Sequence, residues 1–265
     1  MTEKSFTTTD GAVLRYLDEG AGRTVVLVHG LGCNRAHWEF QRQPLVDAGF
    51  RVIIPDLRLH GESDRPAFGH RVSRLGQDLS ELMDAENLTE VALIGHSLGV
   101  SVALAYVSLA GTRRLSHFVA IDQTPRIVND ASWEWGVREV RWEALEDQLA
   151  GRTPWGDPGR EPAMPAEVAE MVSAAGAFQS FTEEPLRRLA LDHFVSDWRD
   201  AVTLLDVPTW VVTGALSPSF PVESMHWFAD SARHGTLSIY PSSGHCPHWN
   251  EHREFNDDLI GFLAA

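Results

Sequence analysis

The stretch Val91-Ala-Leu-Ile-Gly95-His96-Ser97-Leu98-Gly99 decides which fold this chain is expected to adopt. Its first four residues are apolar, as in a buried strand, and a Gly-x-Ser-x-Gly motif follows without a break. The apolar run 100–107 then predicts a buried helix. The two glycines leave room for a strained strand-to-helix turn that lifts the serine above the sheet edge. Unpaired N–H groups and the dipole at a helix start also favour negative charge beside that serine.

Strand and helix patterns alternate on both sides of this motif. Asp10-Gly11 predicts a hairpin turn within residues 5–17. Short apolar runs predict buried strands at 24–28, 51–55, 118–121, 209–214 and 237–240, and apolar periodicity predicts helices at 36–48, 71–86 and 255–263. This order predicts an α/β fold, a mostly parallel, doubly wound sheet with helices on both faces.

The strand pattern stops between residues 126 and 200. This segment has helical tendency, is broken by several prolines, and contains Trp133, Trp135, Trp142 and Trp155. We therefore expect residues 126–200 to form a helical cap inserted into a core made of 1–125 and 201–265. We expect the four tryptophans to contact a bulky apolar substrate, although some must pack the small core of the cap itself.

Composition excludes several classes of partner. The 265-residue chain has a formal net charge of -15, which disfavours nucleic acid and anionic membranes as partners. The sequence has no apolar run of ~18 residues and no leader pattern, so no membrane span is expected. Cys33 and Cys246 form no disulfide framework, which fits a reducing cytoplasm. His245-Cys-Pro-His248 supplies too few ligands for zinc, and we expect neither metal nor cofactor. The oligomeric state is not fixed by the sequence.

Four motifs along the chain carry a resemblance to the α/β-hydrolase superfamily: His29-Gly30, Asp56…Gly61-x-Ser63, Gly95-His-Ser-Leu-Gly99 and Gly244-His245. The resemblance covers nearly the whole chain and implies Ser97 as nucleophile and His245 as base. It also implies an oxyanion hole made by the backbone N–H groups of Leu98 and Leu31. The chemistry agrees, because a serine hydroxyl needs a base that takes its proton during attack, and histidine has the suitable pKa.

The acid of the triad departs from the usual pattern of this superfamily. The usual acid follows the strand 209–214, where Ser217 stands in this chain. Asp122 directly follows the preceding strand, and parallel strands end on the same side of a sheet, so its carboxylate can reach His245. Glu223 is a rival acid, and a site without an acid is a third alternative. The alternative role of Asp122 is to cap a helix of the insert.

An acid on the earlier strand resembles two branches of the superfamily. One contains the cofactor-independent 2,4-dioxygenases of 3-hydroxy-4-oxoquinolines, and the other contains hydrolases of resorcylic lactones. The chain also shares its general look with carboxylesterases and non-haem haloperoxidase-like hydrolases. His96 within the motif is expected to serve packing. We expect His29, Gly30 and His37 beside the substrate, His37 being the only histidine just after the His29-Gly30 loop.

Three functions remain open from the sequence. The first is cleavage of an ester or lactone of a bulky apolar molecule by a Ser-His-Asp triad. The second is cofactor-free cleavage of a 2-alkyl-3-hydroxy-4(1H)-quinolone by a His-Asp dyad, with release of carbon monoxide. In that reaction the dyad deprotonates the substrate and the serine only helps to bind it. The third is a ligand-binding receptor with slow turnover. The partner is in each case a small apolar or heteroaromatic molecule.

Overall fold

An eight-stranded sheet forms the centre of the computed structural model, which describes residues 2–138, 140–154, 156–176 and 178–265. The strands lie in the order β1-β2-β4-β3-β5-β6-β7-β8. β1 and β2 form the predicted hairpin, β2 pairs antiparallel with β4, and the pairs from β4 to β8 are parallel. The strands are β1 (Thr2–Thr7), β2 (Val13–Gly20), β3 (Thr24–Val28), β4 (Arg51–Pro55), β5 (Val91–His96), β6 (Leu115–Ile121), β7 (Pro208–Gly214) and β8 (His234–Tyr240).

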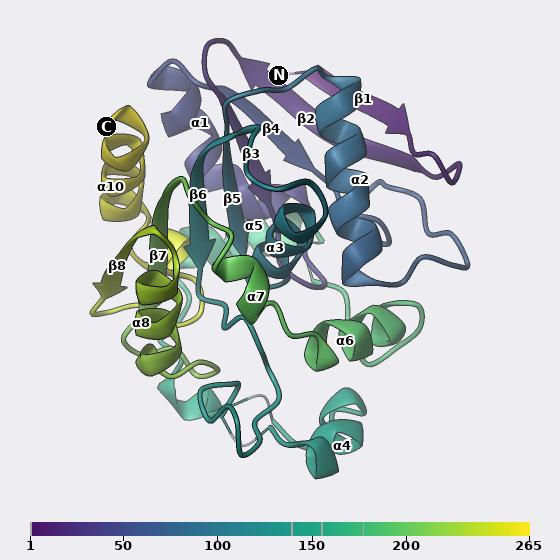
Figure 1. Ribbon diagram of the computed structural model, residues 1–265, viewed down its shortest axis with the longest axis vertical. Coiled ribbons are helices and arrows are strands. Elements are labelled where there is room, and N and C mark those ends of the chain that lie inside the picture. The colour runs from purple at the N-terminus through teal and green to yellow at the C-terminus, as the bar shows by residue number, and fades with distance from the viewer. Residues whose placement is uncertain (1, 139, 155, 177) are drawn as a thin grey trace.

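Helices cover both faces of the sheet, which confirms the predicted α/β-hydrolase architecture (Figure 1). The helices that pack on the sheet are α1 (Glu39–Asp47), α2 (Val72–Ala85), α3 (Leu98–Ala110), α8 (Val222–Ser231) and α10 (His252–Ala264). The short elements around them are η1 (Arg35–Trp38), α7 (Arg199–Val202) and α9 (Pro247–Asn250).

The hydrophobic core is divided into two layers by the sheet. Because successive side chains of a strand point to opposite faces, Val26 and Val28 belong to the layer that contains α2, α3 and α8, whereas Val25 and Leu27 belong to the layer of α1 and α10. The middle strands of the sheet are apolar on both faces because each face is covered by a hydrophobic layer. Packing on both sides also holds the ends of these strands in place.

Between β6 and β7 the described residues form α7, isolated β-bridges and further short helices, which are η2 (Trp142–Ala144), α4 (Leu145–Leu149), η3 (Pro158–Arg160), α5 (Ala166–Ala174) and α6 (Leu186–Val195). Figure 1 shows α4 and α6 together beyond one end of the sheet. We keep the word cap for residues 126–200, the division that the sequence predicts.

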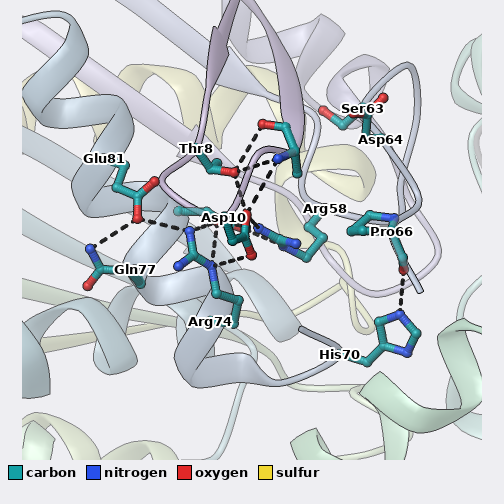
Figure 2. A network of polar contacts seen from close by, with 12 residues as sticks. Thr8, Asp10, Arg58, Ser63, Asp64, Pro66, His70, Arg74, Gln77 and Glu81 are labelled. Carbon is teal, nitrogen blue, oxygen red and sulfur yellow. Dashed lines mark hydrogen bonds and ion pairs between the residues drawn. The ribbon is translucent and has the colours of Figure 1, made fainter. Parts of the chain in front are cut away.

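A buried ionic network joins the β1–β2 hairpin, the loop after β4 and α2 (Figure 2). The guanidinium of Arg58 is fully buried and binds both carboxylate oxygens of Asp78 at 2.8 Å. It also binds Asp10 at 3.0 Å, and Arg74 binds Asp78 at 2.7 Å. This network fixes the 56–63 loop, from which His60 accepts a hydrogen bond from the backbone N–H of Gly32.

Some elements differ from the sequence prediction. β6 and β8 begin three residues earlier than expected, and α8 and α9 were not predicted. Both helices begin beside a proline, at Pro221 and Pro247. A proline is compatible with a helix start, but it does not supply the apolar periodicity by which a helix is predicted. Among the described residues no helix is long and apolar enough to cross a membrane.

Candidate active site

Ser97 lies on the predicted turn between β5 and α3, with φ 53° and ψ -123°. A non-glycine residue rarely adopts such a conformation, so the surroundings must enforce it. A Cβ on Gly95 would lie 2.6 Å from the carbonyl group of Gly99, and a Cβ on Gly99 would collide with the carbonyl oxygen of Val28. The two glycines of the motif are therefore required for β5, β3 and α3 to approach closely enough to raise the serine.

His245 pairs with Asp122 across two strand ends. The imidazole Nδ1 of His245 lies 2.6 Å from Asp122 Oδ2, in the geometry of an N–H that donates to a carboxylate. His245 follows β8, and Asp122 follows β6 with a positive φ of 43°. The side chain of Asp122 is completely buried, whereas 27% of the His245 side chain is exposed.

Hydroxyl groups from the neighbouring strand end complete the hydrogen bonding of Asp122. Thr213 Oγ1 donates to Oδ1, and Ser217 Oγ donates to Oδ2 at 2.8 Å. Ser217 stands where the superfamily usually has its acid, so in this chain that position supports the displaced carboxylate. The rival Glu223 is exposed on α8, and no hydrogen bond joins it to His245 in the described part of the chain.

Two neutral histidines hold the loop that carries Leu31. The N–H of Leu57 donates to His29 Nε2 at 3.1 Å, which leaves Nδ1–H to donate to the carbonyl of Gly30 at 2.8 Å. The N–H of Gly32 donates to His60 Nε2 at 3.1 Å, so His60 Nδ1–H donates to the Arg58 carbonyl.

The protonation states fit these roles. Burial lowers the pKa of His29 to about 4, and it lowers that of His60 to about 3. Both rings are therefore neutral near pH 7 and can accept the backbone N–H groups. The sequence analysis placed His29 at the site but gave no role to His60, although it lies in the quoted Asp56…Ser63 motif.

A cavity of about 430 Å³ opens beside Ser97 and His245. Its lining is mainly apolar and comes from both the core and the cap. The apolar lining residues are Leu31, Ile127, Val137, Phe178, Phe181, Phe194 and Phe220, and the polar ones are Ser97, Gln123, Gln179, Ser180, His193, Ser219 and His245.

The structure brings together only some of the residues that the sequence predicts for the site. Leu31 lines the cavity, and Leu98 begins α3 directly after Ser97. Trp133 is buried against Trp135 and Trp227, while 40% of Trp135 and 47% of Trp142 is exposed.

The cavity wall therefore has phenylalanines of the cap where tryptophans were expected. Phe178, Phe181 and Phe194 lie in the wall, whereas Trp133, Trp135 and Trp142 lie outside it. Trp155 falls outside the described residues. Composition indicated an apolar cap, but it could not show which aromatic rings turn inward.

His37 also lies apart from the cavity, in a buried group with His96 and His248. His37 Nε2 and His248 Nε2 are 2.9 Å apart, and the rings of His37 and His96 stack with 4.7 Å between centroids. His96 Nε2 lies 2.9 Å from the carbonyl oxygen of His245. The group thus supports the backbone of the loop that carries His245, which agrees with the packing role expected for His96.

Among the described residues, these three histidines are the group that most resembles a metal site, because one nitrogen from each ring lies within 4.8 Å of the others. A metal ion lies near the plane of each imidazole that binds it. The rings of His37 and His96 are inclined by only 26° and face one another, so their nitrogens do not converge on one point. The arrangement favours packing over metal binding.

A carboxylate of the cap reaches the catalytic loop, which the sequence did not indicate. Glu161 accepts a hydrogen bond from the backbone N–H of His245 at 3.0 Å. A Cβ on Gly244 would collide with this carboxylate. The glycine of the Gly244-His245 motif is therefore also the residue that lets the cap side chain approach.

Comparison with known proteins agrees with this geometry. The model of a family described as the alpha/beta hydrolase family matches residues 25–258. The chain is 29% identical to a non-heme chloroperoxidase of Kitasatospora aureofaciens, over 97% of this chain and 98% of that protein.

Solved esterases have a similar structure. A thermophilic esterase from Thermogutta terrifontis superposes with a TM-score of 0.79 at 26% identity, covering 100% of this chain and 98% of the esterase. An esterase from Exiguobacterium antarcticum superposes with a TM-score of 0.86 at 21% identity, over 98% and 99% of the two chains. At that identity the second likeness concerns the fold alone.

Proposed function

The chain belongs to the alpha/beta hydrolase family, and we propose that it is a serine hydrolase that cleaves an ester or lactone of a bulky apolar small molecule. One observation carries the proposal: Ser97, on its strained turn, and His245, paired with buried Asp122, line the same cavity. The similar structure of the Thermogutta terrifontis esterase, at 26% identity, supports the same reaction class.

In the proposed mechanism Ser97 Oγ attacks the carbonyl carbon while His245 Nε2 takes the hydroxyl proton. The carboxylate of Asp122 accepts the Nδ1–H of His245, which fixes the tautomer and stabilises the imidazolium that forms. The N–H groups of Leu98 and Leu31 bind the oxyanion, an effect worth about 3 kcal/mol per donor in comparable sites. His245 then protonates the leaving alcohol, and water hydrolyses the acyl-serine by the reverse sequence of proton transfers.

The cavity supports an apolar substrate. Four phenylalanines and three aliphatic residues lie in its wall, and no lysine, arginine, aspartate or glutamate does so among the described lining residues. A volume of about 430 Å³ suits a medium-sized small molecule. The buried rings favour a ring system or a medium acyl chain over a short polar one.

The test is the Ser97→Ala variant, because a covalent mechanism needs the hydroxyl. We expect kcat for an aryl ester to fall by ~10⁴ or more, leaving only catalysis by the oxyanion hole and binding. An organophosphonate should label the unmodified protein once, at Ser97. Ser219→Ala is the matched control, since Ser219 also lines the cavity but lies away from the turn.

The Ser97→Ala variant also distinguishes the proposed hydrolase from a cofactor-free dioxygenase. In that case 2-alkyl-3-hydroxy-4(1H)-quinolone would be consumed with oxygen uptake and carbon monoxide release, and Ser97→Ala would cost about tenfold, as expected for one hydrogen bond. Hydrolysis of an aryl ester under argon, abolished in Ser97→Ala, supports the hydrolase. Oxygen-dependent turnover of the quinolone by a nearly active Ser97→Ala enzyme would refute it.

A further inference from the structure

Two polar side chains in the cavity wall have hydrogen-bonding atoms that the protein leaves unpaired. They are Gln123, directly after Asp122 on the core side, and His193, on helix α6 of the cap. Their exposed fractions are 1% and 4%. Buried polar atoms normally have a partner, so each such atom needs an explanation.

The orientation of the Gln123 amide is fixed by its other end. Its Nε2 donates to the carbonyl oxygen of Thr124 at 2.8 Å. Its Oε1 is buried and has no partner among the described residues. Because an amide oxygen can only accept, only a group that donates a hydrogen bond can satisfy it.

His193 offers a donor and an acceptor together. Neither of its ring nitrogens has a hydrogen-bond partner in the described part of the chain, and Nδ1 is buried. Burial lowers the pKa of His193 to about 3, so the ring is neutral, with one N–H and one bare nitrogen. A hydroxyl or an amide N–H beside a carbonyl can complement such a ring.

The charge of the wall narrows the choice of ligand. The described lining residues include no aspartate, glutamate, lysine or arginine, so a charged group buried beside Gln123 or His193 would have no counter-ion. A carboxylate is also disfavoured because the amide oxygen of Gln123 would face it as a second acceptor. A neutral hydrogen-bond donor remains.

We propose that Gln123 and His193 form a specificity subsite for a neutral hydroxyl or amide N–H on the otherwise apolar acyl part of the substrate. The role of the subsite in selecting a substrate rests on the proposed hydrolase function. Its hydrogen-bonding capacity does not depend on that function. A purely apolar substrate would bury both polar groups without partners, whereas a substrate with a donor at the right position would satisfy them.

The experiment compares p-nitrophenyl octanoate with p-nitrophenyl esters of 3-, 5- and 8-hydroxyoctanoate. We expect kcat/KM for at least one hydroxylated ester to exceed that of the octanoate by roughly tenfold or more, as loss of a matched hydrogen bond does in polar pockets. In Gln123→Leu and in His193→Phe this ratio should fall by about tenfold, chiefly through KM. Ser180→Ala is the control, because that lining hydroxyl already pairs with Thr182 at 2.7 Å.

A binding measurement separates this proposal from the proposed function. The Ser97→Ala protein is titrated with 2-octanone and with its 3-, 5- and 8-hydroxy derivatives, with tryptophan fluorescence as readout. We expect at least one hydroxyketone to bind roughly tenfold tighter than 2-octanone, and the preference to vanish when Gln123→Leu and His193→Phe are added.

The outcomes differ for the two proposals. If no ester is hydrolysed but the hydroxyketone preference holds, the subsite stands and the serine hydrolase fails. If esters are hydrolysed but the hydroxyl gives no advantage in rate or binding, the subsite is refuted. A preference that survives both substitutions also refutes it. A melting temperature for each variant shows that its fold is intact.

Discussion

The core side and the cap side of the cavity differ in how they treat buried polar groups. On the core side, Asp122 accepts hydrogen bonds from Thr213, Ser217 and His245, and the ring nitrogens of His29 bond to the backbone. On the cap side, His193 is buried without a protein partner among the described residues. With the exception of Gln123 Oε1, the core side pairs these buried polar groups within the protein, whereas the cap side leaves His193 without a partner among the described residues. The groups of the proposed reaction are therefore fixed by the protein, and the groups of the proposed subsite are left to the ligand.

On the core side, removing the charge of Asp122 should have the largest effect after that of Ser97→Ala. In Asp122→Asn the fold is kept, but the amide cannot stabilise the imidazolium and favours the wrong tautomer. We expect kcat to fall by ~10³–10⁴ with an aryl ester, measured at constant pH. Glu223→Gln is the matched control, because Glu223 is an exposed carboxylate on α8. A large loss in the control and a small one in Asp122→Asn would contradict the assignment.

Disturbing the loop of the oxyanion hole should have a smaller effect. His60→Leu removes the acceptor of the Gly32 N–H, so the neighbouring Leu31 N–H loses its fixed position. We expect kcat to fall by about 10², less than complete removal of an oxyanion donor can cost, with KM changed little. His234→Leu alters an exposed histidine and serves as control. A purely structural role for His60 would lower the melting temperature but leave kcat per folded enzyme unchanged.

On the cap side, removing an aromatic ring from the cavity wall should weaken the binding of a large substrate. Phe181 lines the cavity and contacts the ring of Phe194. Phe181→Ala should raise KM for p-nitrophenyl octanoate by roughly tenfold and barely change KM for the acetate, because a buried ring contributes about 2 kcal/mol only where substrate covers it. Trp135→Ala, outside the wall, is the comparison. Equal changes for the two esters would show that the ring only packs the cap.

Acid should weaken the fold through histidines of both sides. The pKa values of His29, His60 and His193 are lowered to about 4, 3 and 3 by burial. As pH falls below the unfolded value of about 6.5, the unfolded chain binds protons that the folded chain does not, so the free energy of unfolding decreases until the folded pKa is reached. Urea unfolding at pH 7.5 and 5.5 measures this loss.

The contribution of a single histidine can be isolated in the same measurement. His193→Phe removes one titrating group, and the loss between pH 7.5 and 5.5 should shrink by about 1 kcal/mol. His234→Phe, at an exposed position, should leave it unchanged. If the two variants show the same pH dependence as the unmodified protein, His193 is not held neutral by burial.

Local patterns allowed much of the fold and of the geometry of the candidate site to be predicted. The turn at Ser97 follows from a strand, two glycines and a helix that are contiguous in the sequence. Asp122 could be found because parallel strands end on one side, and the structure pairs it with His245. In both cases the short-range pattern contains the physical cause of the geometry.

Other features depend on contacts between distant segments, and no local pattern encodes them. The hydrogen bond from Gly32 to His60 joins two loops, and Glu161 reaches His245 from the cap. Which aromatic rings of the cap line the cavity depends on its tertiary packing, which hydrophobicity alone cannot resolve. The same holds for His193, whose isolated position on α6 becomes informative only when its surroundings are known.

The hydrogen bond between Ser217 and Asp122 also bears on how such sites diverge. The two side chains come from adjacent strand ends, and Asp122 Oδ2 lies 2.8 Å from Ser217 Oγ and 2.6 Å from His245 Nδ1. Exchanging them, as Asp122→Ser with Ser217→Asp, would keep a carboxylate beside His245 without moving the backbone. We therefore expect the exchanged protein to keep an acid for His245, so that either of the two strand ends can supply it.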